Sequence, residues 1–126
     1  MQDEPKAAEI LPAIAKFLRE TVTTDHSAHT IFQARVAANA TDLAAREAQL
    51  APALDAAELT RLRKLLGTDG DLASLNRLLA DRIADGSLTL TTPGLKAHLW
   101  ATSLAKLAVD QPSYASYRRA LKRMAI

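Results

Sequence analysis

Hydrophobic residues recur every three or four positions along almost the whole chain, and this spacing limits the fold more than any other feature. An α-helix brings such positions to one face. Only residues 87–92 alternate like a β-strand, with Leu88 and Leu90 between polar residues. No second segment is available to pair with it, and a lone strand would leave backbone groups without partners. The sequence therefore predicts an all-α protein in which residues 87–92 form an extended connector with both leucines in the core.

Alanine and leucine supply most of the hydrophobic side chains. The 126 residues include 26 Ala and 20 Leu, whereas aromatic residues make up only 4%. Small side chains let helix axes approach closely, which suits tight antiparallel pairs. The length corresponds to one domain. We therefore expect residues 1–126 to form a single-domain bundle of five to six helices.

Prolines and capping residues predict the boundaries of the first three helices. Asp3 can cap the first helix, and Pro12 either bends that helix or lies just after its true start. A second helix should run from about Ala28 to Leu50, because Pro52 disfavours helix at the residue before it. Asp55 is then the expected cap of a third helix that ends near Leu66.

Three further helices follow from similar signals. Asp71 should cap a fourth helix, and Gly86 should end it. Thr92 as cap and Pro93 in the first position predict the start of a fifth helix. Ser113 should cap a short sixth helix, whose hydrophobic stripe consists of Tyr114, Tyr117, Leu121 and Met124.

Composition excludes several classes of function. The chain has no Cys, so it cannot form disulfides, thiolate metal sites or iron–sulfur clusters. It has four Gly and none of the glycine-rich phosphate-binding patterns or common hydrolase motifs. Asp25, His26 and His29 lack a nearby fourth ligand, so we expect neither a metal site nor a cofactor. No apolar run is long enough for a membrane span, and the first residues do not resemble a secretory signal, so we expect a cytoplasmic protein.

The net charge of +2 is unevenly distributed. Residues 1–60 carry 5 basic and 9 acidic side chains, whereas residues 61–126 carry 11 basic and 5 acidic ones. A basic C-terminal segment can bind nucleic acid, or it can simply complement the helix dipole and face solvent. We favour the second interpretation and rank nucleic-acid binding last. The four basic side chains concerned are Arg118, Arg119, Lys122 and Arg123.

Two polar residues interrupt the hydrophobic stripe of the second helix. Asn39 lies between Val36 and Leu43 at helical spacing, and Arg35 lies one turn before Asn39. A buried Asn or Arg needs hydrogen-bond partners. One interpretation is a binding site for an anionic or amide-bearing ligand. The other is a structural network, for instance Arg35 paired with a carboxylate from another helix.

The fifth predicted helix carries a polar ridge with four-residue spacing. The ridge comprises His98, Thr102, Lys106 and Asp110. Hydrophobic residues occupy the other sides, so we expect this helix to be central and buried. Lys106 would then be partly buried and able to bind an acidic ligand or act as a base. The alternative is an ion pair of Lys106 with Glu47 or Asp110.

Tyr114 follows Asp110 in the segment that joins the last two predicted helices. Its ring, with that of Tyr117, could stack on a flat ligand beside Arg118. We prefer a structural corner that fixes two helices, in which the buried tyrosine hydroxyls have partners.

Two segments resemble the signature regions of a known bacterial family. They are FQARVAANA at residues 32–40 and TSLAKLAVDQPSY at residues 102–114, with further similarity at residues 5–11 and 70–76. That family is a domain of unknown function, often encoded beside acyl-CoA dehydrogenases and phosphotransferases of the aminoglycoside or choline kinase type. The resemblance implies proteins of those two kinds as partners, but it brings no catalytic residues.

Three functions from different classes remain open. The first is a non-catalytic accessory protein that binds such a partner, linked to acyl-CoA or hydroxyacyl catabolism. The second is a binder of acyl or carboxylate small molecules, which uses an interhelical cleft with Arg35, Asn39 and Lys106. The third is weak nucleic-acid binding by the basic C-terminal helix. No motif argues for an enzyme, and an Ala-rich bundle also leaves homodimerisation open.

Overall fold

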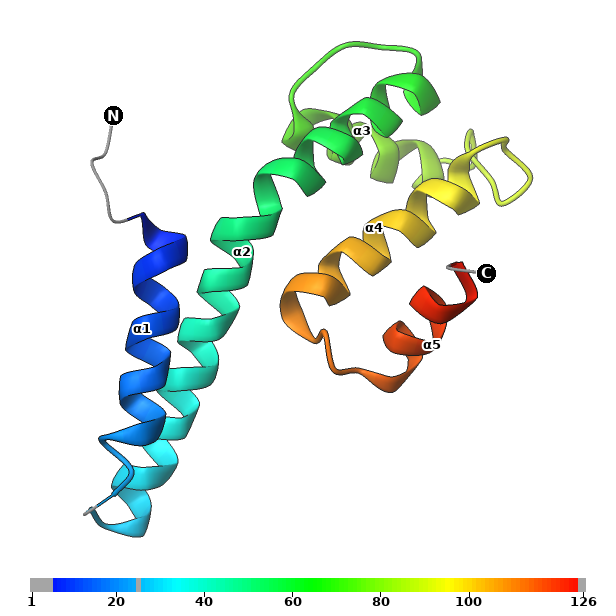
Figure 1. The fold of residues 1–126 in the computed structure, drawn as a ribbon. Helices are drawn as coiled ribbons and strands as arrows, with labels where there is room; N and C mark the ends of the chain where they lie inside the picture. The colour runs from blue at the N-terminus through cyan, green and yellow to red at the C-terminus, as the bar shows by residue number, and fades with distance from the viewer. Residues whose placement is uncertain (1–5, 25, 125–126) are drawn as a thin grey trace. The chain divides into compact units, whose positions relative to one another are not determined.

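The computed structural model describes residues 6–24 and 26–124, which form α-helices joined by turns (Figure 1). The five helices are α1 (Ala7–Glu20), α2 (Ala28–Leu66), α3 (Leu72–Ala84), α4 (Leu95–Asp110) and α5 (Ala115–Met124). Within the described ranges there is no strand, so the all-α prediction is confirmed. None of the described helices combines the length and hydrophobicity needed to cross a membrane.

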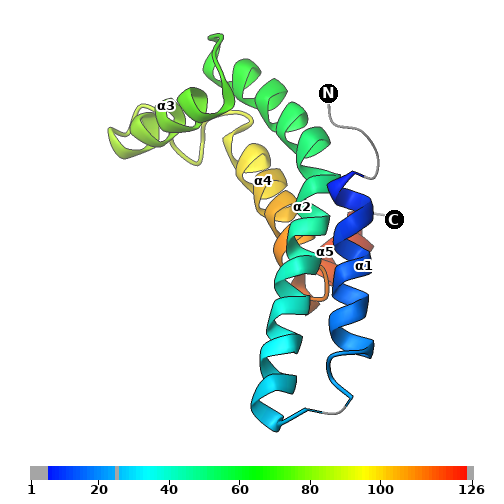
Figure 2. The same ribbon diagram turned by 90° about the vertical axis from the view of Figure 1, so that its left-hand side faces the viewer.

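Two compact units divide the chain, residues 1–51 and residues 52–126. The prediction of a single domain over residues 1–126 stays a prediction. In the first unit, α1 lies beside the first part of α2 and runs antiparallel to it (Figures 1 and 2). The buried side chains of this pair are small, because they are all alanine: Ala15, Ala34, Ala38 and Ala45.

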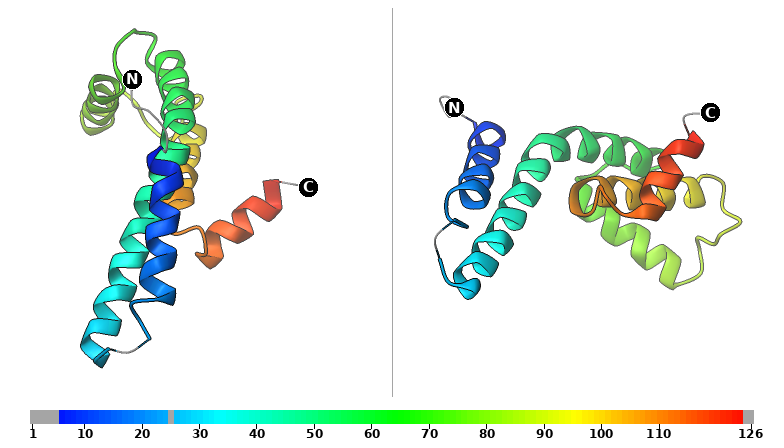
Figure 3. Two further views of the ribbon diagram at one scale, coloured as in Figure 1. Left: turned by 60° about the vertical axis from the view of Figure 1, so that its left-hand side comes forward. Right: turned by 60° about the horizontal axis from the view of Figure 1, so that its bottom comes forward.

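The second unit contains a leucine core. It is built from the last turns of α2, from α3 and from the start of α4. α5 follows α4 after a turn at residues 111–114 (Figure 3). It has no buried residue. The core consists of Leu62, Leu66, Leu75, Leu79 and Leu95.

The predicted break between the second and third helices is wrong. α2 continues through Pro52 to Leu66, so Asp55 lies inside a helix and caps nothing. Proline cannot donate to the carbonyl of Ala48, four residues earlier. Both Pro52 and Ala48 are exposed, so water can bond to that carbonyl, and the surrounding alanines favour helix.

At the first helix, Asp3 lies outside the described residues. Lys6 is the N-cap residue, and its backbone N–H donates to a carboxylate oxygen of Glu9 at 2.9 Å. α1 begins at Ala7 and contains Pro12, so a helix start just before the proline is wrong.

The boundaries of α3 are confirmed. The carboxylate of Asp71 accepts from the backbone N–H of Ser74 at 2.9 Å and from its hydroxyl at 2.8 Å. These two bonds lower the pKa of Asp71 below its ordinary value. Gly86 follows the end of the helix with a φ of +79°, a left-handed conformation that glycine adopts without strain.

The expected start of α4 is wrong. The hydroxyl of Thr92 accepts from the backbone N–H of Thr89 at 3.0 Å, so it belongs to the preceding turn and does not cap the helix. Gly94 is the N-cap residue, with a φ of +87°. In the connector, Leu88 packs against the core as expected, whereas Leu90 is 76% exposed.

The last helix also differs from the prediction. α5 begins at Ala115, and Ser113 lies in the turn before it. The predicted stripe of this helix is largely outside the core, with Leu121 43% and Met124 67% exposed.

Candidate functional site

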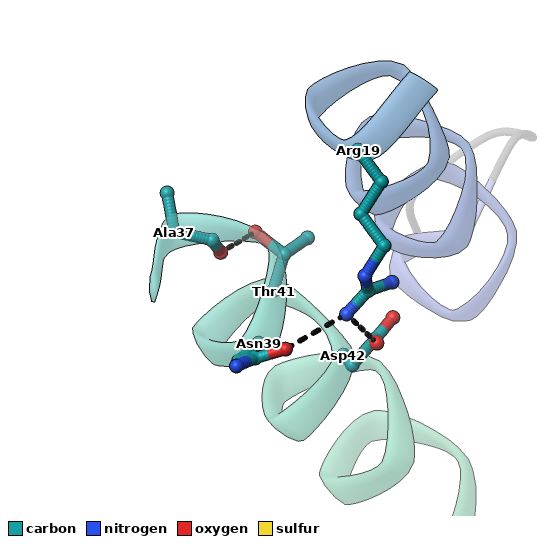
Figure 4. Close-up of polar contacts among 5 residues, drawn as sticks. All are labelled: Arg19, Ala37, Asn39, Thr41 and Asp42. Atoms are coloured by element: carbon teal, nitrogen blue, oxygen red, sulfur yellow. Dashed lines mark hydrogen bonds and ion pairs between the residues drawn. The ribbon is translucent and has the colours of Figure 1, made fainter. Parts of the chain in front are cut away.

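The polar residues predicted on α2 belong to the first unit and contribute to the packing of α1 on α2. Asn39 is exposed, so the expectation of a buried amide is wrong. Its side-chain oxygen accepts from the guanidinium of Arg19 at 3.0 Å, and Arg19 also forms an ion pair with Asp42 at 2.5 Å (Figure 4). The structural network therefore exists, but its arginine is Arg19 of α1 and not Arg35 of α2.

Thr41 lies beside this network and uses its hydroxyl within its own helix. It donates to the backbone carbonyl of Ala37 at 2.7 Å (Figure 4). Each side chain that carries a polar group in the close-up thus has at least one partner from the chain itself. The contacts drawn in Figure 4 all lie within the first unit, where they join α1 to α2 or lie inside α2.

The polar ridge of α4 runs from a buried end to an exposed end. His98 is only 3% exposed and Thr102 is partly buried, whereas Lys106 and Asp110 are exposed. Tyr114, beyond the end of the helix, is 48% exposed. The expected partial burial of Lys106 is therefore wrong, and Lys106 forms no ion pair with Asp110 among the described residues.

The expectation of a helix buried on all sides is also wrong for α4. Only Leu95 and His98 are buried, whereas Trp100 is 56% and Leu99 is 38% exposed. The leucine core of this unit meets α4 at Leu95, near its beginning. The later turns of the helix therefore leave the ridge open to solvent.

His98 lines a pocket of about 300 Å³ in the second unit. Two basic residues of α2, Arg61 and Lys64, lie on one side of it. The turn before α4 and the first turns of α4 form the other side. The remaining lining residues are Leu65, Pro93, Gly94 and Ala97.

Two buried nitrogen atoms beside this pocket lack a hydrogen-bond partner among the described residues. They are Nδ1 of His98 and Nε of Arg61. The hydroxyl of Thr102, one turn after His98, is also buried without a partner. Buried polar groups are nearly always hydrogen-bonded in proteins, so such a cluster calls for an explanation.

The electrostatic environment keeps His98 neutral near pH 7. Burial lowers the pKa of the imidazole below its ordinary value of 6.5, and the positive charge of Arg61 lowers it further. Glu58 acts in the opposite direction. The carboxylate of Glu58 is held in place by Asn76 of α3, whose side-chain amide donates to it at 2.8 Å.

The chemistry of this pocket suits binding of an anion. A guanidinium and an ammonium supply positive charge, and the imidazole can complete a hydrogen bond. Two of the serines use their hydroxyls without a base: Ser103 donates to the carbonyl of Leu99, and Ser116 accepts from Arg119. They also contain no group of three His, Asp or Glu side chains placed to hold a metal ion, and Asp25 lies outside them.

Sequence reasoning found His98 and Thr102 but missed Arg61, Lys64 and Glu58. The sequence does contain a signal for Glu58 and Arg61. Glu58 and Arg61 lie three residues apart beside the stripe of Leu62 and Leu65, which places two opposite charges at the edge of a hydrophobic face.

Comparison with known proteins identifies the family and no closer relative. No curated protein and no solved structure matches the chain. A family model described as a domain of unknown function, DUF6285, matches residues 24–114. This range covers most of the chain and contains α2, α3 and α4 together with the pocket beside His98. The chain therefore belongs to the DUF6285 family of domains of unknown function.

Proposed function

We propose that this protein binds a small carboxylate in the pocket lined by Arg61, Lys64 and His98. The observation that carries the proposal is the pair of buried, unpartnered nitrogens, Nδ1 of His98 and Nε of Arg61. Leaving a buried polar group without a partner costs about 1–3 kcal/mol. A ligand that supplies an acceptor to these groups would recover this free energy, so the pocket favours a ligand of that chemistry.

Charge and shape favour a carboxylate as that acceptor. The planar guanidinium of Arg61 can donate two parallel hydrogen bonds to a carboxylate, with Nε as one donor. Lys64, one turn later, adds a second positive charge on the same wall. A volume of about 300 Å³ suits the head of a small molecule and not a folded partner.

The experiment is a calorimetric titration with acetate, butyrate and hexanoate, with butyramide as the uncharged control. We expect the carboxylates to bind and the amide not to. Arg61→Gln should weaken carboxylate binding about tenfold or more, the scale of a lost charge-assisted hydrogen bond. Arg77→Gln, at an exposed arginine of α3 outside the pocket, makes the same charge change and should bind like the wild type.

Two outcomes would overturn the proposal. One is the absence of binding for every carboxylate at millimolar concentration. The other is equal weakening by Arg61→Gln and Arg77→Gln, because that result would mean that only the overall charge of the protein matters.

A second candidate function, docking of a partner protein, is favoured by the exposed face of α2 in the first unit. Phe32, Val36 and Leu43 are 61%, 47% and 37% exposed and recur at helical spacing on that face. Large apolar side chains gathered in this way often mark protein interaction sites. A phosphotransferase-type kinase or an acyl-CoA dehydrogenase is the partner we propose for it.

This second function is tested by mixing the purified protein with a purified candidate of each class and measuring complex formation by size-exclusion chromatography. Phe32→Ser should abolish a complex. The matched control is Phe17→Ser, which makes the same substitution at a phenylalanine of similar exposure (56%) on α1. If neither candidate forms a complex, or if both variants act alike, this function is wrong.

A further inference from the structure

A second hollow adjoins the pocket of His98, in the same unit. It is an open groove of about 720 Å³ beside the turn that precedes α4. Two large apolar side chains border it, Leu90 at 76% and Trp100 at 56% exposure. The remaining lining residues are Thr91, Thr92, Pro93, Gly94, Lys96 and Ala97.

The groove and the pocket share part of their wall. Pro93, Gly94 and Ala97 line both of them. Gly94 has no side chain and Ala97 has only a methyl group, so two of the three shared residues add little to the wall. A single ligand can therefore extend from one hollow into the other.

The two hollows differ in chemical character. The pocket holds two cationic side chains and the unpartnered nitrogens of His98 and Arg61. The groove has Lys96 as its one charged lining residue and is otherwise bordered by leucine, tryptophan, proline and threonines. An anionic head is therefore favoured in the pocket, and an apolar chain is favoured in the groove.

We infer that the ligand is an amphipathic carboxylate, with its carboxylate beside Arg61 and an alkyl chain of medium length in the groove between Leu90 and Trp100. This inference rests on the proposed carboxylate function and specifies its ligand class. The alkyl chain would cover apolar surface on Leu90 and Trp100 that is exposed to water without it. Each methylene buried in this way strengthens binding about fourfold.

The length of the ligand's alkyl chain is varied in the first part of the experiment. Titration with acetate, butyrate, hexanoate and octanoate should give affinities that rise along the series. The rise should begin at the carboxylate whose alkyl chain is long enough to extend past Ala97 into the groove. Octanol and octylamine carry the same chain without the carboxylate and should bind at least tenfold more weakly than octanoate. An affinity that is equal for acetate and octanoate would overturn this inference and leave the carboxylate function standing.

Substitutions in the wall and groove provide the second part. Leu90→Ser removes an apolar border of the groove and leaves the pocket untouched, so it should weaken octanoate about tenfold and leave acetate binding unchanged. Ala97→Leu enlarges a side chain in the shared wall and should weaken octanoate more than acetate. Leu121→Ser is the matched control, because this leucine is 43% exposed on α5 and outside both hollows. Ala97 and Leu90 are exposed, so neither change disturbs the core.

The outcomes separate the two proposals. Weakening of every carboxylate by about tenfold or more in Arg61→Gln, together with selective weakening of octanoate in Leu90→Ser, supports both. If octanoate binds more tightly than acetate and yet keeps its affinity in both Ala97→Leu and Leu90→Ser, the alkyl chain lies outside the groove. That result would overturn the inference. No carboxylate binding at all would remove the proposed function and this inference with it.

Discussion

The imidazole of His98 on α4 and the guanidinium of Arg61 on α2 line one pocket, and each has a buried nitrogen without a hydrogen-bond partner among the described residues. The positive charge of Arg61 also helps to lower the pKa of His98. An arginine and a histidine of lowered pKa thus lie at one pocket, and each has a buried nitrogen that a hydrogen-bond acceptor could partner. This relationship is the basis of the binding function proposed above.

Stability should fall as the pH decreases through the range in which histidine titrates. Because the pKa of His98 is lowered in the folded state, the unfolded chain takes up a proton more readily. The stabilisation is therefore fully present above the ordinary value of 6.5 and is lost as the pH falls toward the folded-state pKa.

Urea unfolding between pH 7.5 and 5.5 measures this effect. The unfolding free energy of the wild type should decrease across this window, and His98→Leu should show a flatter profile. The two exposed histidines, His26 and His29, remain in the variant and serve as an internal control. An equally steep profile in His98→Leu would assign the pH dependence to other groups.

The ion pair between Arg19 and Asp42 should contribute modestly to the packing of α1 on α2. The two side chains are 41% and 32% exposed, so solvent screens much of their attraction. A double-mutant cycle with Arg19→Met and Asp42→Asn should give a coupling of about 0.5–1 kcal/mol. A coupling indistinguishable from zero would mean that the buried alanines alone hold the two helices together.

Replacing Pro52 by alanine should stabilise α2. The substitution restores a backbone N–H that can donate to the carbonyl of Ala48. Proline in a helix interior costs about 3 kcal/mol relative to alanine, but it also restricts the unfolded chain, so we expect a net gain of about 1–2 kcal/mol. Thermal and urea unfolding measure it, and a loss of stability would show that the fold depends on the local geometry of the proline.

Truncation of a core leucine should cost far more than truncation of an exposed one. Leu62 is completely buried in the second unit, so Leu62→Ala should lower the unfolding free energy by about 2–5 kcal/mol. Leu90→Ala, at a position that is 76% exposed, should change it by less than about 0.5 kcal/mol. Similar losses in both variants would contradict the assignment of the core.

Local signals predicted local structure well wherever the chain itself supplies the hydrogen-bond partner. Asp71 caps α3 because Ser74 lies three residues later, and Gly86 ends the same helix through its positive φ. Prediction failed where another interaction competes for the same group. The hydroxyl of Thr92 is used by the preceding turn, so the start of α4 moves to Leu95.

For the candidate site, the spacing of polar residues on α4 led to His98 and Thr102 but not to their partners. Arg61 lies 37 positions before His98 in the chain, and helical periodicity relates only residues on one helix. The same limit explains why the sequence pattern indicates Arg35 for the network on α2, where Arg19 of the neighbouring helix takes that role.

By itself, the sequence determined that this protein is helical, where most of its turns lie and which residues could form cores, because helix periodicity and capping depend on neighbours within a few positions. The tertiary structure decided which polar side chains lose contact with water. Burial depends on the packing of separate helices, and it is burial that leaves His98 neutral and Arg61 short of a partner, whereas Lys106 stays in solvent.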